Sequence, residues 1–192
     1  KIGSYAETPD GRGYRYALAG ATALAPGKLN VAATVDSNVT NKTVAASAAI
    51  GATSVVIDAG AAIVASVYAD GYLTINDATG EGITYLVNDN TAVAAAGEVT
   101  VTLKDPLAVA VTVDVSEASL TQNPWSGVVI SVADQADLPV GVANVAVTAA
   151  YYGWVQTKGV CAVLADESIT AGLGVTTGSS VVGAVEGLDG AG

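Results

Sequence analysis

Glycine, Asn or Asp punctuates the chain about every ten residues, and short runs rich in Val, Ile, Thr and Tyr lie between these positions. Strand-forming runs bounded at this interval by turn residues are typical of β-sandwiches and β-barrels. Helix patterns are weak throughout, and the Ala-rich stretch 92–96 is too short to form a helix alone. The sequence therefore predicts an all-β protein, with one or two small β-barrel or β-sandwich domains and little or no helix.

The side chains available for a core are small. Apolar residues make up 51% of the 192 residues, but most are Ala and Val, and the chain has no Phe, no Met and only two Trp. Such residues suit facing sheets that lie close together, whereas helical bundles need larger Leu-like side chains. A chain of this length can bury one core or two small ones.

Individual strands and loops follow from the same pattern. We expect polar loops at 36–43 and 134–140. We expect strands near residues 13–18, 53–58, 62–68, 71–76, 82–87, 98–103, 108–115, 127–133, 143–149, 150–158 and 160–164.

The residue composition changes twice along the chain. Residues 31–120 form a run of meander-like strands, whereas residues 1–30 and 121–192 share Tyr, Trp and Pro-Gly turns. We therefore expect an inner β-domain, 31–120, inserted into a discontinuous outer β-domain, 1–30 plus 121–192. Two consecutive domains divided near residue 120 are the alternative.

Charge limits the partners. The net charge is −11, and the seven basic residues are spread singly, so we expect no nucleic-acid partner. The segment 44–67 has the hydropathy of a membrane span, but Gly51, Asp58 and Gly60 interrupt it. Two short strands around a turn at 58–60 explain this segment better, and we expect no membrane association.

Residue types also limit the chemistry. The chain has no His, so Ser-His-Asp and Cys-His catalysis and His-based metal sites are excluded. The single Cys161 excludes an internal disulfide, and its apolar neighbours predict a buried, inert thiol. The 18 acidic residues almost all flank turn residues, which favours solvated turns over a glycosidase pair. We expect a protein that is not an enzyme and carries no cofactor.

The densest acidic loop is Asn76–Glu81, and the run Asn88–Asn90 follows the next strand. Clustered oxygen ligands can hold Ca²⁺. The spacing differs from that of an EF-hand loop, however, and Asx-turns use the same residues. We therefore expect turns here and no metal site.

The stretch Tyr151–Gly159 holds three of the ten aromatic residues of the chain. At a period of two, Tyr152, Trp154, Gln156 and Lys158 share one face of a strand. In a chain without Phe and Met, we expect Trp154 to anchor the core of the C-terminal β-domain, with Gln156 and Lys158 nearer its rim. Such a core ring would contribute about 3–5 kcal/mol to stability.

Tyr14 and Tyr16 have the same spacing of two. The pair predicts either a half-buried strand face, which we favour, or a platform on which a sugar ring stacks.

Five segments carry a resemblance to a known family. They are GYRYALAGATALAPGKL (13–29), VYADGYLTINDATGEGITYLV (67–87), VTVTLKDPL (99–107), NPWSGVVIS (123–131) and YYGWVQTKGVCAVLADESITAGLGV (151–175). In these segments, which cover nearly half of its length, the chain resembles β-rich structural proteins of tailed bacteriophages, marine phages especially, that act as capsid decoration (cement) proteins. The resemblance implies a β-barrel or β-sandwich that sits on the capsid lattice, often as a trimer at three-fold positions.

We therefore expect a non-enzymatic virion structural protein at the capsid surface, which clamps neighbouring subunits of the major capsid protein and forms a homo-oligomer, with a trimer favoured. The N-terminal stretch is too short and polar to fold alone. The expected contact residues are Lys1, Ile2, Ser4, Tyr5, Glu7, Trp154 and Lys158.

Two other classes remain open. The main alternative is a carbohydrate-binding or adhesion module displayed on a virion or cell surface. The direction of Tyr14, Tyr16 and Trp154 discriminates, because rings packed inward favour a decoration protein and rings facing solvent favour carbohydrate binding. An S-layer-like or filament subunit shares the composition but not the five segments.

Overall fold

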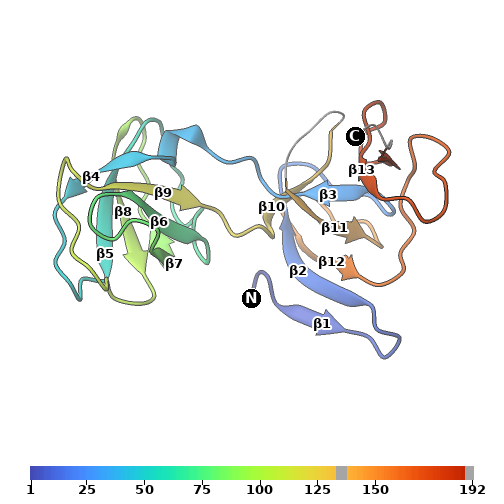
Figure 1. Ribbon diagram of the computed structural model, residues 1–192, viewed down its shortest axis with the longest axis horizontal. Helices are drawn as coiled ribbons and strands as arrows, with labels where there is room; N and C mark the ends of the chain where they lie inside the picture. Colours follow the sequence, from blue (N-terminus) through green and yellow to red (C-terminus); the bar gives the residue numbers. More distant parts are fainter. Residues whose placement is uncertain (133–137, 189–192) are drawn as a thin grey trace. The chain divides into compact units, whose positions relative to one another are not determined.

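The computed structural model describes residues 1–132 and 138–188. Within these ranges the protein is all-β, as predicted, and its only helical element is the short 3-10 turn η1 (Ser37–Val39). The chain forms two compact units: Lys1–Thr34 with Pro124–Gly192, and Val35–Asn123 (Figure 1). We call them the outer unit and the inner unit. The predicted division put these boundaries at 30/31 and 120/121, and in the structure they fall at 34/35 and 123/124.

The inner unit is a closed barrel of six strands in the order β4-β5-β8-β7-β6-β9 (Figure 1). All neighbouring strands are antiparallel, and β9 closes the ring because it pairs with both β4 and β6. The strands are β4 (Lys42–Ala46), β5 (Ser54–Ala59), β6 (Tyr72–Asp77), β7 (Thr84–Asn90), β8 (Gly97–Leu103) and β9 (Glu117–Thr121).

Alternating residues of these strands fill the barrel. In β5, for example, Val55, Ile57 and Ala59 are buried, whereas Ser54 and Asp58 are exposed. Alternate residues of the other strands and several residues of the connecting segments, such as Tyr68, complete a core with Leu, Ile and Val side chains and two tyrosine rings. Each buried side chain of Leu or Ile size contributes about 1.5–3 kcal/mol to folding.

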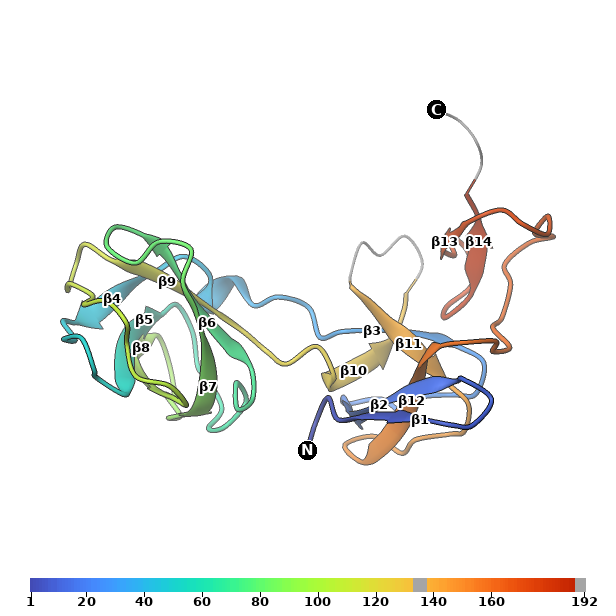
Figure 2. The same cartoon turned by 60° about the horizontal axis from the view of Figure 1, so that its bottom comes forward.

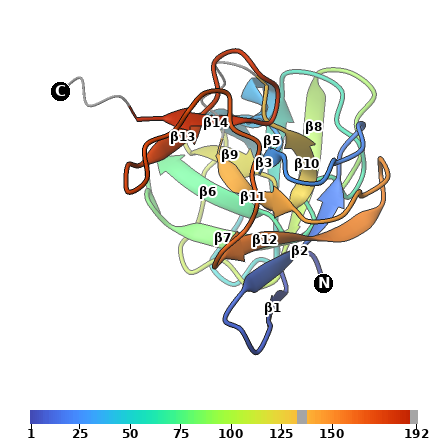
Figure 3. The same ribbon diagram turned by 90° about the vertical axis from the view of Figure 1, so that its right-hand side faces the viewer.

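The outer unit also contains a closed ring of strands. Its sheet has the order β1-β2-β10-β3-β11-β12, and β12 pairs back onto β2. β1 remains outside this ring as an edge strand beside β2, as Figure 3 shows at the lower side of the view. The strands are β1 (Tyr5–Glu7), β2 (Gly13–Ala19), β3 (Leu29–Val31), β10 (Ser126–Ile130), β11 (Pro139–Ala143) and β12 (Tyr152–Lys158).

A separate hairpin of β13 (Val175–Thr177) and β14 (Val185–Gly187) completes the described part of the outer unit. Figure 2 shows it apart from the closed ring. The core of the ring consists mainly of Ala and Val, with Leu24 as its largest fully buried member and Trp125 and Ile130 packed against it.

Three predicted strands, 62–68, 108–115 and 143–149, are wrong. Each of them makes one isolated bridge: Ile63 with Val93, Val111 with Ala48, and Val147 with Leu24. The chain then turns through residues with positive φ, namely Ser66, Asp114 and Ala150. A residue in the left-handed conformation interrupts the extended backbone of a strand. Because Ala rarely adopts this conformation, the sequence gives no indication that Ala150 does so.

Other local predictions also need correction. The predicted strand 160–164 is not a strand, and the predicted loop 36–43 contains η1 and the start of β4. The predicted loop 134–140 ends early, because β11 begins at Pro139, the first strand position, where the missing N–H of proline is tolerated. Residues 134–137 of this loop, and residue 133 at the end of the predicted strand 127–133, lie outside the described residues.

The prediction that Cys161 is buried is also wrong, since its side chain is exposed. The reason is the absence of a strand at 160–164, which leaves these residues without the inward and outward alternation that the prediction assumed.

Candidate functional site: two faces of the outer unit

The register between β2 and β12 determines which side chains share the outward face of the outer unit. The two strands are antiparallel, with Trp154 opposite Tyr16 and Gln156 opposite Tyr14. Directly opposed residues in antiparallel strands project to the same face, and so does Tyr152, two positions before Trp154. The residues between them, such as Val155, face the core.

Three of these side chains form what we call the aromatic shelf: Tyr16, Tyr152 and Trp154. The rings of Tyr16 and Tyr152 are stacked, with centroids 5.5 Å apart and planes 6° from parallel. The ring centroids of Tyr16 and Trp154 lie 5.1 Å apart, with planes tilted by 57°. Tyr152 is 54% exposed and Trp154 is 40% exposed, so large ring surfaces face solvent.

The prediction that Trp154 anchors the core is therefore wrong. The alternation of β12 was predicted correctly as far as Gln156, but Val155 and not Trp154 faces inward. The inner side of β12 has no room for a large ring, because even a Cβ added at Gly153 would clash with the side chain of Val147. The indole consequently lies on the outward face.

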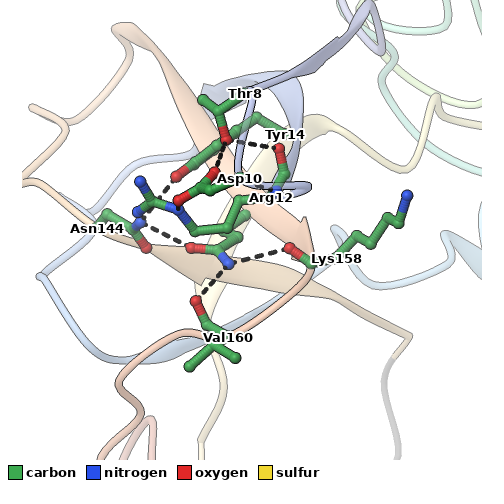
Figure 4. Close-up of polar contacts among 8 residues, drawn as sticks. Thr8, Asp10, Arg12, Tyr14, Asn144, Lys158 and Val160 are labelled. Carbon is green, nitrogen blue, oxygen red and sulfur yellow. Dashed lines mark hydrogen bonds and ion pairs between the residues drawn. The ribbon is translucent and has the colours of Figure 1, made fainter.

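One end of the shelf carries hydrogen-bonding groups, which we call the amide end: Tyr14, Asn144 and Gln156. Figure 4 labels Tyr14 and Asn144 of this group. Asn144 Nδ2 donates to Gln156 Oε1 at 2.8 Å and to the Tyr14 hydroxyl at 3.4 Å. Gln156 Nε2 donates to the carbonyl oxygens of Lys158 and Val160 at 3.0 and 2.9 Å. Gln156 was predicted near the rim, but it is 3% exposed, because the chain after β12 covers it.

The turn between β1 and β2 adds a charged pair beside the amide end (Figure 4). Arg12 Nε donates to Asp10 Oδ2 at 2.7 Å, and the Thr8 hydroxyl donates to the same carboxylate. The Thr8 hydrogen bond is the main cause that lowers the pKa of Asp10, with Arg12 contributing further. The Asp10 carboxylate in turn raises the pKa of Arg12. The turn therefore stays an ion pair at neutral pH.

The N-terminal residues pair with β2 and do not extend freely from the unit. Gly3 N donates to Tyr16 O at 2.8 Å, and Ser4 O accepts from Tyr16 N at 2.9 Å. The Arg15 guanidinium lies between two rings, 5.2 Å from the centroid of Tyr5 and 4.9 Å from that of Trp125. Such cation–π contacts attach β1 to the ring of strands.

Tyr5, Glu7 and Lys158 form an exposed group that we call the edge patch. The Tyr5 hydroxyl donates to Glu7 Oε2 at 2.5 Å, and Lys158 Nζ lies 3.3 Å from Glu7 Oε1. The hydrogen bond from Tyr5, followed by that from Lys158, lowers the pKa of Glu7, and the same Glu7 contact raises the pKa of Tyr5. The groups are exposed, so their pairing contributes little to stability.

The edge patch and the aromatic shelf lie on opposite faces of the same strands. Tyr5 and Glu7 pair with Arg15 and Gly13, which belong to the inward-facing set of β2. A register shift after Gln156 brings Lys158 opposite Gly13 as well, so Lys158 does not share the face of Trp154 as predicted. Figure 4 shows the Lys158 amino group directed away from the amide end.

The seven predicted contact residues are thus divided. Trp154 belongs to the shelf, whereas Tyr5, Glu7 and Lys158 form the edge patch. Lys1 and Ser4 are exposed and Ile2 is half-buried beside β1. Sequence reasoning missed Asn144, which lies in a loop with no pattern that relates it to Tyr14 or Gln156.

The acidic loop at 76–81 forms a turn, in which Asp77 Oδ1 accepts from Ala78 N at 2.6 Å. In the part of the chain that the structure describes, no three Cys, Asp or Glu side chains lie where they could hold a metal ion. The described residues also contain no helix of the length and apolar character needed to cross a membrane.

Comparison of the chain with protein-family models, with curated proteins and with solved structures gives no match.

Proposed function

We propose that the protein is a non-enzymatic structural protein of a bacteriophage virion, which decorates the capsid and clamps neighbouring major capsid subunits. Three observations support this proposal: the five segments that resemble decoration proteins, a chain with only 13% charged residues, and a fold of two small closed rings of β-strands. Proteins of this kind act by contact area and main-chain pairing.

The observation that carries the proposal is the open edge of β1. Within residues 1–132 and 138–188, β1 pairs with β2 alone. Thr8 N donates to Arg12 O, and Ser4 O accepts from Tyr16 N, so the alternate residues Tyr5 and Glu7 direct their backbone groups away from β2. Unpaired backbone groups of an edge strand are ready to pair with an extended segment of another chain.

The side chains around this edge fit a protein partner. Tyr5 is 46% exposed, and the Glu7–Lys158 pair offers one charge of each sign. A segment of the major capsid protein that adds to β1 would gain main-chain hydrogen bonds from the edge and specificity from these side chains. A trimer at three-fold positions, as the resemblance implies, would let three such edges act together.

Deletion of residues 1–8 tests the attachment. We expect the truncated protein to be lost from purified particles, measured as copies per capsid by quantitative mass spectrometry. Full occupancy after the deletion would refute the role of β1.

A sharper pair of variants separates edge pairing from side-chain contact. Glu7→Pro removes both the carboxylate and an N–H that faces the open edge, whereas Glu7→Ala removes the carboxylate alone. We expect low occupancy for Glu7→Pro and nearly normal occupancy for Glu7→Ala, with similar melting temperatures for both. Equal occupancy of the two variants would show that main-chain pairing is not the means of attachment.

The second candidate function is carbohydrate binding by a displayed module. The direction of the rings favours it, because Tyr16 and Trp154 lie on the outward face and not in the core. The two functions do not compete for the same residues, since the edge patch and the aromatic shelf are on opposite faces.

A further inference from the structure

The aromatic shelf exposes large ring surfaces to solvent. Three ring-bearing side chains lie side by side and two of them are at least 40% exposed, in a chain whose apolar residues are mostly Ala and Val. Aromatic side chains have about 150–250 Å² each, so at their exposed fractions Tyr152 and Trp154 present on the order of 200 Å² to solvent. Grouped aromatic side chains are common in the sites that bind small molecules.

The area limits the class of ligand. A stable protein interface needs about 800 Å² on each partner, well above what the shelf offers. A single-stranded nucleic acid would stack on such rings, but it also requires a positively charged groove. The chain carries a net charge of −11, and the nearby Arg12 is paired with Asp10. A small uncharged ligand remains.

The amide end supplies the matching polar groups. Both N–H bonds of Asn144 Nδ2 are used within the protein, whereas its exposed carbonyl oxygen accepts no hydrogen bond from any described residue. Arg12 bonds to Asp10 through Nε, and its terminal nitrogens donate to no other described side chain. An acceptor and a donor thus lie together, which suits hydroxyl groups because each hydroxyl both donates and accepts.

These groups line a hollow of about 460 Å³, together with Gln156, Pro26 and Cys161. This volume lies within the range of about 300–1,000 Å³ that is usual for small-molecule sites. None of the three shelf rings lines the hollow, but Gln156, which lines it, lies two residues after Trp154 on β12, and its side chain accepts a hydrogen bond from Asn144. The hollow and the shelf are therefore neighbouring regions of the same strand.

We propose that the aromatic shelf and the amide end together bind a neutral oligosaccharide. The apolar face of one sugar ring would stack on Tyr152 and Trp154, and the hydroxyl groups of the next would meet Asn144 and Arg12. This inference deepens the second candidate function, carbohydrate binding, and is independent of capsid attachment through β1.

The test is a titration of the full chain with soluble neutral tetrasaccharides of glucose in different linkages, followed by tryptophan fluorescence and calorimetry. An acidic uronic-acid tetrasaccharide serves as the charged comparison. We expect a change in fluorescence and saturable binding of at least one neutral probe, and much weaker binding of the acidic one. Absence of binding to every neutral probe at millimolar concentration overturns the proposal.

Two neighbouring tyrosines give a matched pair of variants. Tyr152 is stacked on Tyr16, whereas Tyr151 is 66% exposed but belongs to no ring pair. Tyr152→Ala should weaken binding about tenfold, in line with the energy of an aromatic contact, whereas Tyr151→Ala should leave it unchanged. Asn144→Ala should weaken binding as well. Equal losses for Tyr151→Ala and Tyr152→Ala would overturn the assignment of the site.

The result is separate from that of the capsid experiment. If the protein binds no sugar, but the Glu7→Pro variant is lost from capsids, the decoration function stands and the glycan site does not. If the protein binds sugar through Tyr152, but the variant without residues 1–8 still occupies capsids fully, the glycan site stands and attachment through β1 does not.

Discussion

The inner and outer units are both closed rings of short strands, but they use their large side chains in opposite ways. The inner core holds eighteen buried apolar residues, which include Leu, Ile and the rings of Tyr68 and Tyr85. Among the described residues of the outer unit, the core cluster holds nine, mostly Ala and Val. Yet five of the eight Tyr and both Trp belong to the outer unit, where Tyr152 and Trp154 face solvent.

The difference shows that the unit with more aromatic side chains is not the unit that buries more of them in its core. The inner unit buries its large side chains and so gains its stability from them. The outer unit holds together through main-chain pairing and a core of small residues, and the Tyr152 and Trp154 side chains of the aromatic shelf remain exposed to solvent. We infer that the inner unit is a scaffold and that the outer unit carries the recognition surfaces.

The largest expected effect comes from the inner core. Ile57 is fully buried, so Ile57→Ala should reduce the free energy of unfolding by about 3 kcal/mol through a cavity. Val56→Ala, at a half-buried position of the same strand, should cost well under half of that. Both Trp belong to the outer unit, so circular dichroism should report this loss while the tryptophan fluorescence transition stays in place. An equal shift of both signals would show that the units unfold together.

A smaller effect is expected from the tightest contact of the outer core. Gly153→Ala forces a methyl group against Val147 and should destabilise the outer unit by about 1–3 kcal/mol, as overpacking does. The double variant with Val147→Ala should recover part of this loss, because it removes the opposing methyl groups. Chemical unfolding followed by fluorescence measures both, and a neutral Gly153→Ala would show that the outer core is loosely packed.

Much of the fold could be predicted from the sequence, because turn residues and β-branched runs are local signals. The all-β class and the strands around residues 13–19, 54–59 and 97–103 follow from them. The strands expected at 62–68 and 108–115 could not be distinguished from bridges followed by turns, since the positive φ at Ser66 and Asp114 depends on how the barrel ends close. The strand Glu117–Thr121 was missed because the predicted strand 108–115 extended across the turn at Asp114 that precedes it.

The candidate site was predictable only in part. A period of two identifies which residues of β12 share a face, but not which face is inward. That choice depends on the close approach of Val147 to Gly153, two residues with no sequence signal that connects them. Asn144 and Gln156 are likewise brought together only by the pairing of β11 with β12.

The central claim is that the rings of the aromatic shelf serve recognition and not folding. The most direct test is the free energy of unfolding of Trp154→Ala, with Val155→Ala as the buried neighbour on the same strand. We expect a loss of about 1 kcal/mol or less for Trp154→Ala, the size of a cross-strand contact on an exposed face. We expect about 2 kcal/mol for Val155→Ala, because it leaves a cavity in the core. A loss of about 3–5 kcal/mol for Trp154→Ala, the cost of removing a core ring, would contradict the account.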